Sequence, residues 1–267
     1  MKEHAKMKRW ILSIIACVSL AACGQKDDSI IKIGATSGPH AQVVEAVAIE
    51  AKKQGVNIEV IEFSDYITPN AALADGSLNL NSYQHLPFLE NYNNGNNANL
   101  VSIGESILMR MGVYSNKYSS LADLPDNAQI AIPNDPTNGG RGLLLLEEAK
   151  LITLKPDVGF TASLNDIIDN PKGLKFVEVE AAQLPRSLDD VDAAAITMNY
   201  VMSAGLNPQK QGLFLEAKDA PLAVMVIAAR EDEKDNSDYQ KVVSIFHSQP
   251  IAEFMQEAFN GTIEPAS

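Results

Sequence analysis

The sequence predicts an α/β protein with two sheets. Apolar runs of strand length alternate with segments whose apolar residues recur at helical spacing. Clusters of turn-forming residues separate most of these segments. The alternation starts near residue 30 and begins again near Leu121, as expected for two successive sheets rather than one long barrel.

The first round of the pattern predicts its elements in order. Strands are expected at residues 30–35, 58–63, 78–81 and 101–114, the last of them one strand or two with a break near Met111 and Gly112. Helices are expected at residues 39–54, 66–75 and 84–92. The first of these helices has Pro39 in its first turn and Gly55 as its C-terminal cap.

The second round of the strand–helix pattern, from about Leu121 onward, predicts a larger number of shorter elements than the first round. Strands are expected at residues 129–132, 175–179, 193–197, 213–215 and 222–228. Helices are expected at residues 141–150, 164–169, 183–188, 200–204, 237–246 and 250–259. Ser237 with Gln240 fits a capping box at the start of the penultimate helix, and Gly261 fits the end of the last one.

Residues 130–152 contain the most informative single pattern. A short apolar run is followed by turn formers at residues 133–140 and then by strong helix formers, so Arg141 is expected at a helix start. Helix N-termini favour anions. Arg141 and the amides around Gly139 and Gly140 could therefore hold a small carboxylate in a bidentate grip. The alternative is a helix cap with a solvated arginine. If the grip exists, Arg141→Ala weakens ligand binding and barely changes the stability of the ligand-free protein.

The first 22 residues have the pattern of a signal peptide. A basic segment precedes an apolar segment, residues 10–22, that is too short to span a bilayer comfortably. Small residues then precede Cys23, which resembles the lipobox of bacterial lipoproteins and predicts a lipidated Cys23 after cleavage. An ordinary secretory signal is the alternative. Residues 23–29 form a polar tether. Cys17 is lost with the signal, so no disulfide and no thiolate metal site are expected.

The charge balance limits the possible partners. The whole chain has a formal net charge of −13, and residues 1–22 hold four basic residues and one acidic residue, which leaves −16 for the remainder. A chain this acidic is poorly suited to nucleic acid or to anionic lipid, so membrane attachment is expected through the lipid anchor alone.

Motifs for catalysis, cofactors and metals are not found. The four histidines are scattered, and no nucleophile elbow, phosphate loop or dinucleotide fingerprint occurs. The pair Asp189-Asp190 is expected to face water rather than to form a catalytic dyad. We therefore expect no enzyme activity, no cofactor and no metal site.

Several long stretches resemble the NlpA/MetQ family of methionine-binding lipoproteins, the substrate-binding subunits of ABC importers. The stretches are GATSGPH (residues 34–40), FSDYITPNAALADG (63–76), QHLP (84–87), IPNDPTNGGR (132–141) and VEAAQLPRSLDDVDAA (179–194). The resemblance implies a two-lobed, type II periplasmic-binding-protein-like fold with the ligand in the cleft between the lobes. Residues 30–112 and 222–267 would form lobe 1, and residues 113–221 would form lobe 2.

The resemblance also implies a set of ligand-binding residues. Asn138 and Arg141 match the positions that hold the ligand carboxylate. Tyr66, Tyr83 and His85 match positions that line the pocket for the ligand side chain, and Asn199 lies in a stretch that contributes polar groups. Without the resemblance, core packing for the two tyrosines and a loop-bracing role for His85 remain open.

Four positions depart from the polar or aromatic residues that are usual in the family. These possible altered pocket positions are Ile107, Met109, Thr197 and Val224. A buried ammonium needs hydrogen-bond acceptors, and apolar residues supply none. We therefore expect the site to discriminate weakly in favour of an α-amino group and to tolerate des-amino analogues.

The resulting expectation is a monomeric lipoprotein of the bacterial cell envelope that binds L-methionine or a related small carboxylate and delivers it to an ABC permease. One alternative is a divergent member that binds another apolar amino acid, a small peptide or a des-amino acid. Another is a surface interaction lipoprotein with a vestigial pocket. An enzyme is the third class, and turnover of a bound compound would support it.

Overall fold

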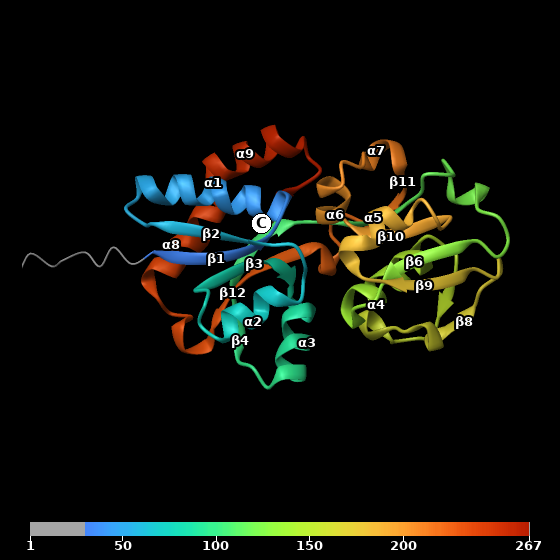
Figure 1. Cartoon of the computed structure of the whole chain (residues 1–267), viewed down its shortest axis with the longest axis horizontal. Helices are drawn as coiled ribbons and strands as arrows, with labels where there is room; N and C mark the ends of the chain where they lie inside the picture. The colour runs from blue at the N-terminus through green and yellow to red at the C-terminus, as the bar shows by residue number, and fades with distance from the viewer. Residues whose placement is uncertain (1–29, 267) are drawn as a thin grey trace, which may run out of the picture.

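The computed structural model describes residues 30–266, which form two sheets, each with its own helices, arranged side by side along the long axis of the molecule (Figure 1). The predicted signal peptide, Cys23 and most of the tether lie outside the described residues. We call the body around the first sheet lobe 1 and the body around the second sheet lobe 2.

Lobe 1 contains a six-stranded sheet with the order β13-β4-β12-β3-β1-β2. Its strands are β1 (Ile31–Thr36), β2 (Ile58–Phe63), β3 (Leu80–His85), β4 (Leu100–Leu108), β12 (Val224–Arg230) and β13 (Glu264–Pro265). β1 is parallel to β2 and β3, whereas β12 is antiparallel to β3 and β4. Its helices are α1 (Pro39–Lys53), α2 (Thr68–Ala74), α3 (Leu86–Asn96), α8 (Ser237–Phe246) and α9 (Gln249–Phe259).

Lobe 2 contains a five-stranded sheet with the order β11-β5-β10-β6-β9. Its strands are β5 (Met111–Tyr114), β6 (Gln129–Pro133), β9 (Lys175–Val179), β10 (Ala193–Thr197) and β11 (Gly212–Leu215), and a separate small pair is formed by β7 (Thr153–Leu154) and β8 (Ile167–Asp169). Its helices are α4 (Pro136–Glu148), α5 (Leu184–Ser187), α6 (Met198–Ser203) and α7 (Pro208–Gln211).

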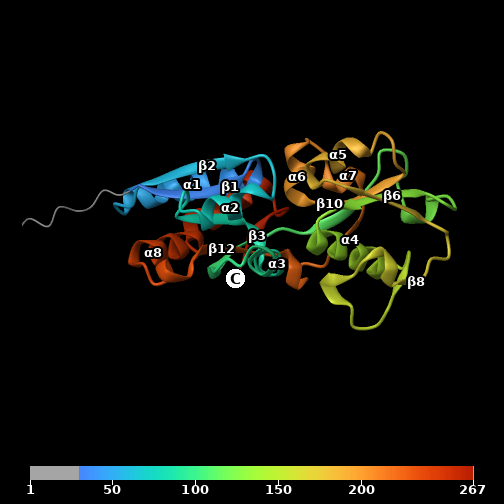
Figure 2. The ribbon, with the colours of Figure 1, turned by 60° about the horizontal axis from the view of Figure 1, so that its bottom comes forward.

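The chain passes between the sheets twice. It leaves lobe 1 after β4 through Met109 and Arg110, and it returns through residues 216–223 to β12. Figure 2 shows the two bodies joined by these connections. The predicted α/β class with two sheets is confirmed. The proposed lobe boundary at residue 112 differs from the strand pairing, because Met111 and Gly112 pair with β10 of lobe 2.

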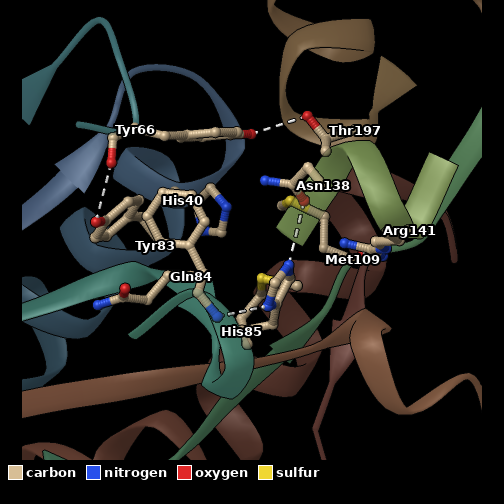
Figure 3. Close-up of a pocket in the computed structure, with 11 residues that line it drawn as sticks. His40, Tyr66, Tyr83, Gln84, His85, Met109, Asn138, Arg141 and Thr197 are labelled. Atoms are coloured by element: carbon tan, nitrogen blue, oxygen red, sulfur yellow. Dashed lines mark hydrogen bonds between the residues drawn. The ribbon is translucent and has the colours of Figure 1, made fainter. Parts of the chain in front are cut away.

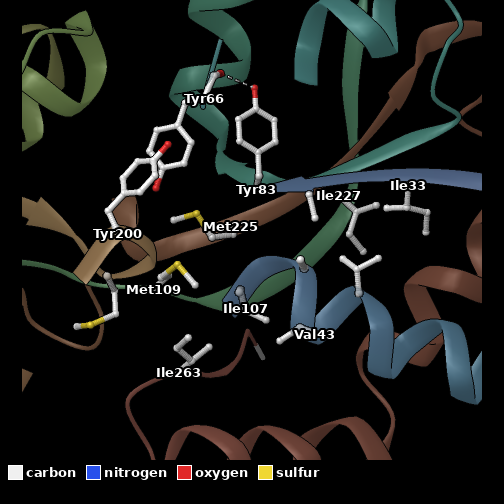
Figure 4. Close-up of a cluster of buried hydrophobic side chains, with 14 of the residues drawn as sticks. Ile33, Val43, Tyr66, Tyr83, Ile107, Met109, Tyr200, Met225, Ile227 and Ile263 are labelled. Carbon is white, nitrogen blue, oxygen red and sulfur yellow. Dashed lines mark hydrogen bonds between the residues drawn. The ribbon is translucent and has the colours of Figure 1, made fainter. Parts of the chain in front are cut away.

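The core of lobe 1 forms where α1 covers the sheet. One face of α1, formed by Val43, Val44, Val47 and Ala51, is buried. Figure 4 shows Val43 beneath the sheet residues Ile33 and Ile227, with a tyrosine cluster at the end of the same apolar cluster. Burial of these side chains stabilises the wall on which the polar site is built.

Helix α4 begins five residues earlier than expected, which corrects the local prediction for Arg141. Asp135 caps the helix by accepting a hydrogen bond from the Asn138 N–H at 2.8 Å, and Pro136 occupies the first helical position. Gly139 and Gly140 are therefore helical, and Arg141 lies in the second turn, too far inside to share the N-terminal amides. Gly140 is required by packing, since an added Cβ would lie 2.0 Å from the Phe160 carbonyl oxygen.

Three other elements differ from the sequence prediction. Gln84 and His85 continue β3, and α3 starts only at Leu86. The expected helix at residues 164–169 is a single 3₁₀ turn followed by β8. Helix α8 is capped by Asn236, whose side chain accepts from the Asp238 N–H at 2.9 Å, rather than by a Ser237 capping box. In each case a side-chain cap or a sheet partner overrides the local propensity.

Candidate functional site

A narrow cavity lies between the two lobes (Figure 3). It encloses about 20 Å³ that the centre of a water molecule can occupy, which is roughly the room of one water. An amino acid therefore enters only when the walls move apart. The lining residues come from both lobes: His40, Tyr66, Tyr83, Gln84, His85, Phe88, Met109, Asn138, Arg141, Thr197 and Met225.

Arg141 is buried at one side of the cavity and is held by the chain itself. Its Nε and Nη2 donate to the two carboxylate oxygens of Glu216 at 2.8 and 2.5 Å, and Nη2 also donates to the Met109 carbonyl oxygen at 2.9 Å. The Arg141 and Glu216 side chains are only 2% and 7% exposed. The bidentate partner of Arg141 in this structure is therefore a glutamate of lobe 2, not a vacant carboxylate position.

The Nη1 nitrogen of Arg141 takes no part in the hydrogen bonds to Glu216 and Met109. It makes no hydrogen bond within residues 30–266, although Arg141 borders the cavity. Nη1 carries two N–H donors, so it can bind one carboxylate oxygen or two without disturbing the pair with Glu216.

A hydrogen-bonded chain joins the lobes at the base of the cavity. The His85 Nδ1 accepts from the Phe88 N–H at 3.2 Å, which places the ring proton on Nε2. Nε2 then donates to the Asn138 Oδ1 at 3.2 Å, and the Asn138 Nδ2 donates to the Asp135 carboxylate at 3.1 Å. Burial, with a smaller effect from the Arg141 charge, lowers the pKa of His85 to about 3, so the imidazole is neutral near pH 7.

Aromatic rings form the apolar wall. Tyr66 packs against Tyr200 with ring centroids 4.7 Å apart and against Tyr83 at 6.0 Å. The Tyr66 hydroxyl shares a hydrogen bond of 2.9 Å with the Thr197 hydroxyl across the lobes, and the Tyr83 hydroxyl donates to the Tyr66 carbonyl oxygen at 3.1 Å. Burial raises the pKa of both Tyr66 and Tyr83, so the phenols stay protonated. They are at once core residues and cavity lining.

Helix α6 forms a further set of contacts between the lobes. The Asn199 Nδ2 and the Ser203 Oγ both donate to the Ser37 carbonyl oxygen at 3.2 Å. Gly38, with φ at +99°, allows this approach, since an added Cβ would lie 2.1 Å from the Ser203 Oγ. The Asn199 amide nitrogen is thus turned toward the Ser37 loop, its buried Oδ1 has no hydrogen-bond partner within residues 30–266, and Asn199 is not among the residues that line the cavity, so its role in ligand binding stays a prediction.

Two of the four possible altered pocket positions also lie elsewhere. Ile107 is buried in the lobe 1 core, where Figure 4 shows it with Val43 and Ile263. Val224 is the first residue of β12, where the strand register is irregular, and it is not among the residues that line the cavity, whereas its neighbour Met225 is. Met109 and Thr197 do line it, as do the five expected residues Tyr66, Tyr83, His85, Asn138 and Arg141.

Five residues of the site were not predicted as such: His40, Gln84, Phe88, Met225 and Glu216. His40 and Gln84 lie in two of the family-like stretches, which was an available signal. Burial lowers the pKa of His40 to about 3, and its Nδ1 has no hydrogen-bond partner within residues 30–266. Gln84 is fixed by reciprocal amide hydrogen bonds with Asn70, both at 2.7 Å. Glu216 carried no sequence signal.

The model of the NlpA lipoprotein family matches residues 31–267. The chain belongs to the NlpA lipoprotein family. The D-methionine-binding lipoprotein MetQ of Salmonella typhimurium is 43% identical to it over 254 residues, which is 93% of each chain.

Solved structures of similar proteins agree with the fold. A nutrient-binding protein from Burkholderia cenocepacia bound to methionine is 43% identical, with a TM-score of 0.86, and the match covers 89% of this chain and 100% of that one. A periplasmic substrate-binding protein of an ABC transporter from Coxiella burnetii is 43% identical, with a TM-score of 0.85, and covers 88% and 100%. The family member described here thus has the two-lobed periplasmic-binding-protein-like fold.

The described residues contain neither a candidate metal site nor a candidate membrane-spanning helix. In the part of the chain from residue 30 to residue 266, no three His, Cys, Asp or Glu side chains are grouped so that they could hold a metal ion. Over the same residues, no helix combines the length and apolar character needed to cross a membrane.

Proposed function

We propose that this chain is the substrate-binding lipoprotein of an ABC importer and that it binds methionine, or a closely related amino-acid-type carboxylate, between its lobes. The observation that carries the proposal is a buried cavity with an arginine on one side and an apolar wall rich in aromatic rings and thioethers on the other. The methionine-bound relative and the name of the Salmonella protein support the same ligand.

The polar end of the ligand is assigned to Arg141. Its Nη1 has two N–H donors that point to no residue of the described chain, and a carboxylate is the natural partner of a guanidinium. Figure 3 shows Asn138 next to Arg141, so the ligand backbone would lie beside it.

The side chain of the ligand is assigned to the apolar wall. Phe88, Met109, Met225 and the rings of Tyr66 and Tyr83 line this part of the cavity. A thioether gains favourable contacts with aromatic ring edges and adapts to irregular spaces. Methionine fits this lining better than a charged or strongly polar side chain, whose burial would go uncompensated.

Delivery completes the proposed role. Lipidation of Cys23 would hold the monomeric protein at a membrane of the bacterial cell envelope, and a permease would receive the ligand when the lobes separate. Exchange between closed and open lobes is compatible with the five side-chain hydrogen bonds that join the described parts of the lobes, since each contributes only about 1 kcal/mol.

The hydrogen bonds among the side chains of the cavity favour a second candidate function for this lipoprotein. Asn138, His85, Thr197 and most of Arg141 already bond to protein groups. A member with these groups engaged would bind a less polar ligand or keep the cavity only as a vestige, and act as an interaction lipoprotein at the surface.

Mass spectrometry of the small molecule that copurifies with residues 24–267 separates these candidates, followed by calorimetry on refolded, ligand-free protein with L- and D-methionine. Arg141→Lys keeps a positive charge for Glu216 but removes Nη1, so methionine affinity should fall by about 10-fold or more. Arg186→Ala, which removes an exposed arginine of lobe 2, is the matched control and should bind as the wild type does. Absence of binding by either enantiomer to the wild type, together with the absence of any copurifying amino-acid-type carboxylate, would refute the proposal.

A further inference from the structure

We infer that Glu216 determines the specificity of the cavity: it neutralises Arg141, so the site selects an amino-acid zwitterion over the monoanion that lacks the amino group. The inference rests on the proposed function and names the charge class of its ligand. It reverses the sequence-based expectation of tolerance for des-amino analogues, which considered the missing acceptors but not this carboxylate.

Glu216 is fixed by four contacts where both crossing connections meet. Its carboxylate accepts from the Arg141 Nε and Nη2, and its Oε2 also accepts from the Met111 N–H at 2.8 Å. Its backbone N–H donates to the Met111 carbonyl oxygen at 3.0 Å. Since every one of these partners is buried with it, Glu216 cannot turn toward solvent when a ligand arrives.

None of the other ionisable groups near the cavity adds a positive charge. His40 and His85 are buried and neutral near pH 7, since the pKa of each is lowered to about 3. The half-buried Asp135 carboxylate, at the start of α4, adds a negative charge beside Asn138 and so disfavours an anionic ligand further. Arg110 reaches only the Glu216 carbonyl oxygen, at 3.5 Å, and lines an outer groove with Lys218 and Glu264 instead of the cavity.

The charge of the two fully buried groups, the Arg141 guanidinium and the Glu216 carboxylate, therefore sums to zero before any ligand binds, and the half-buried Asp135 adds a negative charge. A methionine zwitterion adds no net charge, whereas its des-amino analogue adds one negative charge that no buried cation offsets. An uncompensated charge in a buried site is strongly unfavourable, and the usual response is proton uptake. The charge pair thus favours the amino group without any acceptor in direct contact with it.

The test compares methionine with its des-amino analogue by calorimetry on three proteins: wild type, Glu216→Gln and Glu264→Gln. Glu216→Gln keeps the side-chain size and one acceptor oxygen but removes the negative charge. The ratio of the two dissociation constants should shift toward the analogue by about 10-fold or more, equivalent to about 1.4 kcal/mol. Glu264→Gln alters a surface pair with Lys218 outside the cavity and should leave the ratio unchanged. A purely structural role for Glu216 would weaken both ligands equally and leave the ratio as it was.

Proton linkage in the wild type provides a second readout that needs no variant. In buffers with different ionisation enthalpies, methionine should bind without proton exchange, and the analogue should bind with uptake of up to about one proton. Two results would overturn the inference and leave the proposed function unaffected. In the first, Glu216→Gln binds methionine and the ratio of the two dissociation constants is unchanged. In the second, the analogue binds the wild type as tightly as methionine does, with no proton uptake. If neither methionine nor a related amino-acid-type carboxylate binds the wild type, the proposed function is wrong, and this inference is wrong with it.

Discussion

Arg141→Ala is expected to destabilise the protein strongly, in contrast to the small effect that the sequence suggested. In the structure the substitution removes the cation from a buried pair and leaves the Glu216 carboxylate enclosed, 7% exposed, with the Met111 N–H as its remaining donor. The loss is therefore dominated by an unpaired buried charge rather than by a missing ligand contact.

The magnitude follows from the burial of both partners. Removing one partner of a buried ion pair costs about 3–5 kcal/mol, and the remaining Met111 contact places Glu216 near the lower end of this range. For a chain of this size each kcal/mol lowers the Tm by about 2–4 °C, so the Tm should fall by roughly 6–12 °C. The exposed pair Lys218–Glu264, with side chains 61% and 35% exposed, is expected to contribute less than about 1 kcal/mol.

A double-mutant cycle measures this directly. Urea unfolding of Arg141→Ala, Glu216→Ala and the double variant gives the coupling energy of the pair, and the same cycle on Lys218 and Glu264 is the matched control. Far-UV circular dichroism should show that each variant folds before its free energy of unfolding is compared. The double variant should be less destabilised than the sum of the two single variants. A loss below about 1 kcal/mol for Arg141→Ala, or additive single effects, would show that the pair is not buried and coupled as described.

Three further predictions concern other parts of the molecule. The pKa of His40 and of His85 is about 3 in the folded protein and 6.5 in the unfolded chain, so the unfolded state binds more protons between these two pH values. The free energy of unfolding is therefore highest above pH 6.5 and should fall by about 2 kcal/mol per histidine at pH 5. In urea unfolding at pH 5 and 7.5, His85→Gln should reduce this pH dependence. In thermal unfolding, Gly140→Ala should destabilise the protein by about 1–3 kcal/mol, because the added Cβ meets the Phe160 carbonyl oxygen. The control Gly95→Ala in α3, where nothing lies within 4 Å of the added Cβ, should be neutral or slightly stabilising. Equal effects of the two substitutions would contradict the packing described around α4. Cys23→Ser should release the protein from membranes, since acyl chains supply its attachment, and retention of the variant after a high-salt wash would disprove lipidation at this residue.

The sequence by itself determined the features that depend on short-range periodicity and on long family-like stretches. The bounds of β2, β9, β10 and α8 agree with the predicted ones, because alternation and helical spacing are local properties of the chain. The family resemblance also predicted five residues that line the cavity, since a motif at the end of a strand or helix identifies both the residue types and their place in the fold. Both kinds of information concern residues close together in the chain.

Only the tertiary structure decided how the charges of the site are balanced. Glu216 lies 75 residues from Arg141 and belongs to no motif, and it reaches the guanidinium because the second crossing connection passes beside the first. In the same way, the packing of α6 against the Ser37 loop directs the Asn199 amide nitrogen to the Ser37 carbonyl oxygen, and Met225 rather than its neighbour Val224 lines the cavity. Side-chain direction and charge pairing are set by which elements meet in space, and residue spacing along the chain does not contain that information.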